Sequence, residues 1–100
     1  MTDHFNKLTP AQAERLAILA EECGEVIQAI GKILRHGYES RNPFEPHSSN
    51  RQNLEKECGD VSYAIRAIAN AGDIDSESIA RWERTKEKKV KPYLHHQETP

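Results

Sequence analysis

Glu21-Glu22-Cys23-Gly24-Glu25 is the most informative stretch of this chain, and Glu57-Cys58-Gly59-Asp60 repeats its last four positions with one acid exchanged. Both stretches lie in segments whose apolar residues recur at helical spacing. Residues three apart share one face of a helix, so each stretch directs two carboxylates the same way. If the two helices pack antiparallel, these four acids and the adjacent Glu21 converge on one small volume.

A carboxylate cluster of this kind needs a counter-ion. Two unit charges about 5 Å apart repel by roughly 3 kcal/mol at an effective dielectric constant near 20. A divalent cation is the usual way to keep such a cluster ionised, and oxygen-only ligands suit Mg²⁺ or Mn²⁺. The sequence therefore predicts a bound cation between the two helices.

The rest of the chain predicts an all-α fold of three helices with one long loop. A capping box at Thr9 and Gln12 begins the first helix, and a second one at Ser49 and Gln52 begins the second helix. No stretch has the alternation expected of a strand. The expected bounds are 10–35 for the first helix, 37–49 for the loop, about 50–71 for the second helix, and 75 or 76 to about 90 for the third.

The first helix is too broadly apolar for a small monomer. Two adjacent lines of apolar residues widen its stripe to about half of the helix circumference. We therefore expect a homodimer or a tetramer, in which helices of two chains complete a four-helix core across a two-fold axis. Cys23 and Cys58 fall on the expected core faces and are predicted to be buried free thiols. The two lines consist of Leu16, Leu19, Cys23, Ile27, Ile30 and Leu34, and of Ile18, Val26, Ala29 and Ile33.

Length and composition set the outer limits of the interpretation. One hundred residues predict a single domain, 1–100, with a core at about 9–91 and a partly flexible tail at 92–100. A formal net charge of -2 provides no basic footprint for nucleic acid. No apolar run is long enough for a membrane span, and the polar N-terminus is no signal peptide. We therefore expect a cytoplasmic protein.

Acidic pairs on helices are more often solvated faces than metal sites. Here their repetition and their position at the rim of the apolar stripe favour convergence. Gly24 and Gly59 predict a close approach of helices, because a mid-helix glycine costs about 1 kcal/mol relative to alanine. Two other kinds of protein stay open at this point. One is a non-catalytic helical dimerisation or regulatory module with surface acids. The other is a carboxylate-bridged redox di-metal bundle, although neither stretch has the Glu-x-x-His pair of such bundles.

The spacing Glu21-Glu22-x-x-Glu25 followed by Glu57-x-x-Asp60 resembles the acidic signature of the MazG-like all-α nucleoside triphosphate pyrophosphohydrolases, in their small bacterial or phage form. The similarity extends from about residue 10 to residue 95. If a phage encodes the protein, we expect it in the host cytoplasm. The similarity implies that Glu22, Glu25, Glu57 and Asp60 bind Mg²⁺, for which Mn²⁺ can substitute. It also implies that Glu21 holds a second ion or orients the attacking water. The implied reaction is hydrolysis of (deoxy)nucleoside triphosphates between the α- and β-phosphates, which yields a nucleoside monophosphate and pyrophosphate.

Four further residues are candidates for contact with the substrate. Lys32, Lys86 and Lys89 could bind phosphate oxygens, and Asn70 matches a family position near the nucleoside. The alternatives are solvated surface lysines and, for Asn70, a helix C-terminal cap. The segment between the two acidic stretches is longer than in most members of the family, so the preferred base and sugar stay open.

Overall fold

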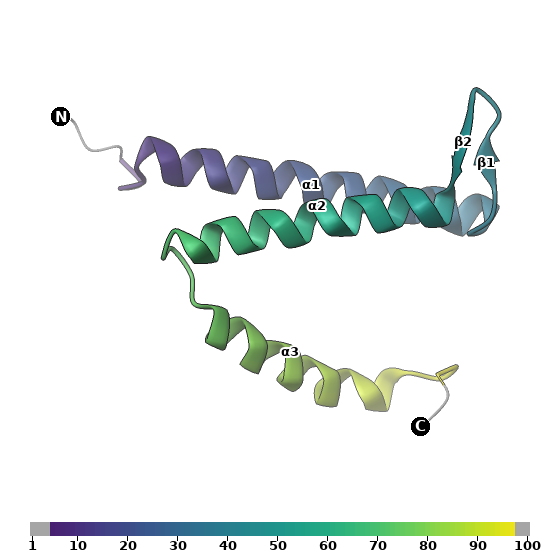
Figure 1. Cartoon of the computed structure of the whole chain (residues 1–100). Helices are drawn as coiled ribbons and strands as arrows, with labels where there is room; N and C mark the ends of the chain where they lie inside the picture. The colour runs from purple at the N-terminus through teal and green to yellow at the C-terminus, as the bar shows by residue number, and fades with distance from the viewer. Residues whose placement is uncertain (1–4, 98–100) are drawn as a thin grey trace.

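The structure, a computed structural model, describes residues 5–97 and consists mainly of three α-helices (Figure 1). The all-α class predicted from the sequence is therefore confirmed. Residues 1–4 and 98–100, which include the end of the tail predicted to be flexible, lie outside the described residues. Among the helices of the described part, none combines the length and the apolar composition needed to cross a bilayer. The elements are α1 (Pro10–His36), β1 (Arg41–Asn42), β2 (Glu45–Ser49), α2 (Asn50–Asn70), α3 (Ser76–Val90) and the 3-10 turn η1 (Lys91–Tyr93).

Both capping boxes predicted from the sequence are present. The backbone N–H of Gln12 donates to the Thr9 hydroxyl at 3.1 Å, and the Thr9 N–H donates to the Gln12 side chain at 2.9 Å. Ser49 and Gln52 make the same pair of bonds at 3.2 Å and 2.9 Å. Each box satisfies two backbone N–H groups that a helix start would leave unpaired, so the two long helices begin where their sequences indicate. α1 ends at His36, and the following Gly37 has a φ of 89°, a conformation that favours glycine.

α1 and α2 lie antiparallel and side by side, and both ends of the pair are tied together (Figure 1). At the open end, Arg15 and Asp73 form an ion pair at 2.9 Å. At the end nearest the strands, the Asn50 N–H donates to the Ser40 carbonyl at 2.9 Å, and the Asn50 amide donates to the Gly37 carbonyl at 3.1 Å. The antiparallel arrangement brings the middle of α1 against the middle of α2, where the two acidic stretches lie.

The segment between α1 and α2 contains a short antiparallel hairpin, so the prediction that it is all loop is wrong. Arg41 pairs with Ser49 and Asn42 pairs with Glu45, with an irregularity between Arg41 and Asn42. Every residue of the first strand is exposed and polar, so no hydrophobic alternation marks it in the sequence. Pro46 is compatible with β2 because each strand of a two-stranded sheet has an edge that needs no donor.

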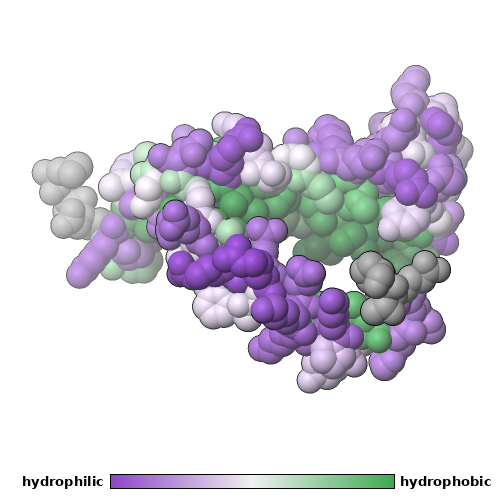
Figure 2. Space-filling view, turned by 60° about the horizontal axis from the view of Figure 1, so that its bottom comes forward, coloured by the Kyte–Doolittle hydropathy of each residue, from purple (hydrophilic) through white to green (hydrophobic). Residues whose placement is uncertain are grey.

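The core of a single chain is thin. The buried apolar residues of the described chain are Ala29 on α1 and Ala64 and Ile68 on α2. In contrast, the α1 side chains Ile27 and Leu34 are 69% and 82% exposed. α3 turns away from the helix pair and carries no buried residue (Figure 1). Figure 2 shows the result as a band of hydrophobic side chains across the middle of the visible face.

Two expectations about the acidic stretches differ from the structure. Cys23 and Cys58 are free, as predicted, but both are exposed rather than buried. A Cβ atom added at Gly24 or Gly59 would meet nothing within 4 Å, so the predicted close approach of helices is absent from the described chain. The physical reason is the same in both cases. These positions turn away from the partner helix, on a side that the thin core of one chain does not cover.

Candidate metal centre

Four carboxylates meet at the middle of the α1–α2 pair. α1 supplies Glu22 and Glu25, and α2 supplies Glu57 and Asp60; one oxygen of each lies within 4.8 Å of one of every other. All four residues are half-buried. Spacing by three residues places each pair on one helix face, and the antiparallel packing turns the two faces toward each other. We call these four residues the acid cluster.

Two oxygens of the acid cluster have no hydrogen-bond partner among the described residues. They are Oε2 of Glu22 and Oε2 of Glu57, and both are shielded from solvent. A buried anionic oxygen without a donor or a counter-ion is costly, because it has lost its hydration and gained nothing in return. An oxygen-only donor set with unpaired buried oxygens fits a hard divalent cation such as Mg²⁺ or Mn²⁺.

The electrostatics of the cluster also reflect the crowding of like charges. The pKa of Glu25 is raised from 4.5 to about 7, mainly because its carboxyl shares a hydrogen bond with Glu57 and also because the Glu57 and Glu22 charges repel it. A proton on Glu25 lets its carboxyl donate to the Glu57 carboxylate. The pKa of Glu22 is raised as well, first by desolvation and then by the charges of Asp60 and Glu21. A cation between these groups would reverse both shifts by favouring the ionised forms.

Glu21 lies next to the cluster but is not part of it. The residue is exposed, and its charge contributes to the raised pKa values of both Glu22 and Glu25. Glu21 is therefore within electrostatic reach of Glu22 and Glu25 while its side chain stays open to solvent.

Lys56 is a member of this neighbourhood that the sequence analysis missed. Its ammonium group pairs with Asp60 at 3.0 Å and with Glu57 at 3.4 Å. These bonds raise the pKa of Lys56. The side chain is 68% exposed, so it covers the cluster from the solvent side. Its position four residues before Asp60 is the signal that could have indicated the contact.

A pocket of about 320 Å³ opens beside the acid cluster. Glu25 and Glu57 form one part of its wall, and Lys32 and Asn50 form another. We call this the acidic pocket. Of the residues predicted to contact substrate, Lys32 is the one that shares a pocket with members of the acid cluster. Its ammonium group brings positive charge to a site that would otherwise repel a polyanion.

The other predicted substrate contacts lie elsewhere in the chain. Asn70 is the last residue of α2, on the exposed surface near the open end of the helix pair. Lys86 and Lys89 are exposed on α3, which diverges from the pair (Figure 1). None of these three residues lines the acidic pocket.

The fold and the site together define a class: all-α proteins in which carboxylates of an antiparallel helix pair form a site suited to a divalent cation. Comparison with protein families is more specific. The model of the MazG nucleotide pyrophosphohydrolase domain matches residues 11–95, and the chain therefore belongs to this family. The resemblance inferred from the acidic stretches is thus confirmed. Comparison with curated proteins and with solved structures gave no match.

Proposed function

We propose that this protein hydrolyses (deoxy)nucleoside triphosphates between the α- and β-phosphates, with a divalent cation held by the acid cluster. Family membership supports nucleotide pyrophosphohydrolase activity in general. The observation that carries the finer proposal is the pair of buried, unpartnered oxygens on Glu22 and Glu57 inside a group of four convergent carboxylates. Mg²⁺ is the proposed cation, and Mn²⁺ is expected to substitute for it.

In this proposal Glu22, Glu25, Glu57 and Asp60 hold the cation. The bound cation would supply Lewis-acid polarisation of phosphate oxygens and neutralise charge that develops on them. Glu21, exposed beside the cluster, would accept a hydrogen bond from the attacking water and so orient it. The reaction adds one water across the P–O–P bridge, and its products are a nucleoside monophosphate and pyrophosphate.

Lysines and one asparagine are proposed to contact the substrate. Lys32 is the best supported, because it lines the pocket that also contains Glu25 and Glu57. Lys86 and Lys89 would reach phosphate oxygens only if α3, or α3 of a second copy, were brought over the site. Asn70 stays a prediction of the same kind. If replacing both Lys86 and Lys89 by alanine leaves kcat and KM unchanged, the two lysines are solvated surface residues without a role in substrate binding.

We also propose that the protein works as a homodimer or a tetramer with a four-helix core. The support is the width of the uncovered apolar surface: Ile27, Leu34 and Trp82 are 69%, 82% and 70% exposed. Obligate homodimer interfaces are large and hydrophobic, as this surface is. Sedimentation velocity at micromolar concentration is expected to show twice or four times the chain mass of 11.4 kDa. A single species of the chain mass would contradict the proposal.

The reaction is tested with a panel of the four common ribonucleoside and four common deoxyribonucleoside triphosphates. Each is incubated with the protein and Mg²⁺, and the products are separated by chromatography. At least one triphosphate should give monophosphate and pyrophosphate in equal amounts, and a chelator should stop the reaction. Orthophosphate as the released product would contradict cleavage between the α- and β-phosphates. Absence of both turnover and tight Mn²⁺ binding would instead support the non-catalytic helical module with surface acids.

A further inference from the structure

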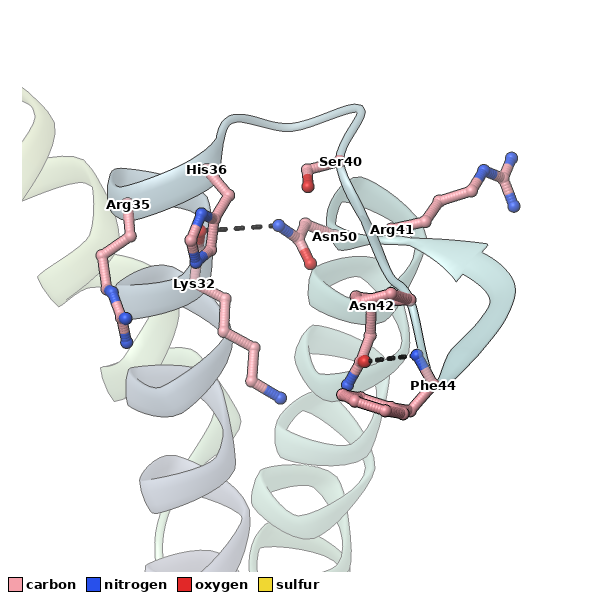
Figure 3. A pocket seen from close by; sticks show the side chains of 9 residues that line it. Lys32, Arg35, His36, Ser40, Arg41, Asn42, Phe44 and Asn50 are labelled. Carbon is pink, nitrogen blue, oxygen red and sulfur yellow. Dashed lines mark hydrogen bonds between the residues drawn. The ribbon is translucent and has the colours of Figure 1, made fainter.

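A second pocket, of about 380 Å³, lies between the C-terminal end of α1 and the strands (Figure 3). We call it the hairpin pocket. Its wall includes Lys32, Arg35 and His36 from the last turns of α1, Asn42 and Phe44 from the hairpin, and Asn50 from the start of α2. In Figure 3 the side chains of Lys32 and Asn42 extend toward the region of Phe44, whereas Arg41 points away from it.

Phe44 is the most unusual part of this wall. It is 91% exposed at the tip of the hairpin, although burial of an aromatic ring is strongly favoured in water. The tip is not loose, because the Phe44 N–H donates to the Asn42 side-chain oxygen at 2.9 Å in a local turn. The ring is therefore presented to solvent by a defined backbone. An exposed aromatic side chain of this kind is a typical platform for a nucleobase.

The hairpin pocket adjoins the acidic pocket. Lys32 and Asn50 line both pockets, so together they form the shared wall. A rise of about 1.5 Å per residue puts Lys32 about 10 Å along α1 from Glu25. A molecule that spans both pockets thus meets three kinds of group in order. Acids suited to a cation come first, a single ammonium group follows, and an aromatic ring with planar Arg35 and His36 side chains comes last.

We propose that the hairpin pocket binds the base of the nucleotide, stacked on Phe44, while Lys32 at the shared wall contacts the phosphates. This inference rests on the proposed function, whose cleavage site it places at the acid cluster. The base is placed in the hairpin pocket because Phe44 lines that pocket, whereas no aromatic residue lines the acidic pocket. The hairpin segment, absent from the sequence-based prediction, is then the specificity element of this chain.

The first experiment measures steady-state kinetics of Phe44→Ala and Phe44→Tyr on the triphosphate panel. Removing one base–aromatic stack should raise KM by roughly 5- to 150-fold while kcat changes little. Phe44→Tyr should restore KM, because it keeps the ring. Tripolyphosphate, which has no base, should be turned over equally by wild type and Phe44→Ala if it is a substrate. Tyr93→Ala is the matched control, because Tyr93 is 75% exposed and lines neither pocket.

The second experiment does not depend on hydrolysis. Adenosine, guanosine, cytidine and thymidine are titrated into metal-free protein, and backbone amide shifts are followed by NMR. Shifts should cluster in residues 40–45 for at least one nucleoside, disappear in Phe44→Ala and persist in Tyr93→Ala. This result would support the base site even if no triphosphate were hydrolysed and the proposed function were wrong. Shifts that are absent or lie elsewhere, or a Phe44→Ala variant with the KM of Tyr93→Ala, would overturn the inference.

Discussion

The acidic pocket and the hairpin pocket share Lys32 and Asn50, but they are held in place by different means. The acids of the first pocket sit in the middle of two long helices that are tied at both ends. The aromatic wall of the second is carried by strands of two and five residues, anchored through a few hydrogen bonds around Asn50. Our proposals thus place cation chemistry on the packed helix pair and base recognition on a short hairpin that few contacts hold.

The largest expected effect comes from changing the acid cluster on the helix pair. Replacing a single acid of the acid cluster by its amide should remove nearly all activity, since each acid supplies anionic oxygen to one shared site. The four variants are Glu22→Gln, Glu25→Gln, Glu57→Gln and Asp60→Asn. The loss in kcat/KM should exceed the roughly 10- to 100-fold effect typical of residues that only support a metal ligand. Mn²⁺ affinity by calorimetry should fall with activity. Glu83→Gln, an exposed acid of α3, serves as the control. Full activity in all four variants would remove the cation from the mechanism.

The next effect concerns the wall between the two pockets. Lys32→Ala should weaken substrate binding, because a hydrogen bond to a charged group contributes about 1.5–3 kcal/mol, or roughly 10- to 150-fold in KM. Mn²⁺ affinity should not fall, since Lys32 holds no cation. Arg66→Ala is the control, because it removes an exposed positive charge from α2 that lines neither pocket. Equal KM values in Lys32→Ala and Arg66→Ala would show that Lys32 does not contact the phosphates of the substrate.

Asn50 tests how the hairpin is held. Asn50 is buried, and its amide donates to the Gly37 carbonyl at 3.1 Å. Asn50→Ala should lower the free energy of unfolding by about 1–3 kcal/mol, because it leaves a carbonyl without its donor. Urea unfolding followed by circular dichroism measures this change. The exposed Asn70, replaced by alanine, should change it far less. An unchanged free energy of unfolding in Asn50→Ala would mean that the strands hold the hairpin pocket in place without the Asn50 side chain.

Glu25 gives the metal-free protein a defined pH dependence. Its pKa in the folded chain is about 7, against 4.5 for an ordinary glutamate. Between these values the folded state binds more protons than the unfolded state, so stability should fall as pH rises through this window. The contribution of Glu25 should therefore make Tm in chelator-treated buffer higher near pH 5 than near pH 8. Glu25→Gln should reduce this difference in Tm. A profile identical in wild type and Glu25→Gln would show that Glu25 titrates normally.

Lys56 should have the smallest effect. Its ammonium group occupies the solvent side of the acid cluster, at 3.0 Å from Asp60. Exposed ion pairs of this kind contribute about 0.2–1 kcal/mol, so Lys56→Ala should tighten Mn²⁺ binding by only about 1.5- to 5-fold. Lys88→Ala, on α3, is the control. Weaker binding in Lys56→Ala would mean that the lysine positions the carboxylates rather than competing with the cation.

These two regions also differ in how far the sequence predicts them. Helical spacing and the capping boxes at Thr9 and Ser49 predict the bounds of α1 and α2 and the helix face on which each acidic stretch lies, because these are properties of local sequence. The hairpin has no such local code. Its polar, exposed strands show no alternation, and its pairing depends on contacts with the helix ends. Phe44 could have been noticed as an isolated aromatic residue between Pro43 and Pro46, but its neighbours could not.

Burial was the other quantity that the sequence misjudged. Periodicity tells which side of α1 is apolar, but it does not tell what covers that side. Cys23 and Cys58 lie on surfaces that a single chain leaves open, and so do Gly24 and Gly59. The same pattern of residues is compatible with a core inside one chain or with a core shared between copies.

The separation of α3 has a consequence for amide hydrogen exchange. Its fifteen residues include no buried side chain, and a helix of this length is only marginally stable in water by itself. Exchange should therefore be slowest around Ala64 and Ile68 and rapid throughout α3 in dilute solution. If a second copy covers Trp82, the protection of α3 should rise with protein concentration while that of the α2 core changes less. Amide exchange in the third helix would then report how far the chains have assembled.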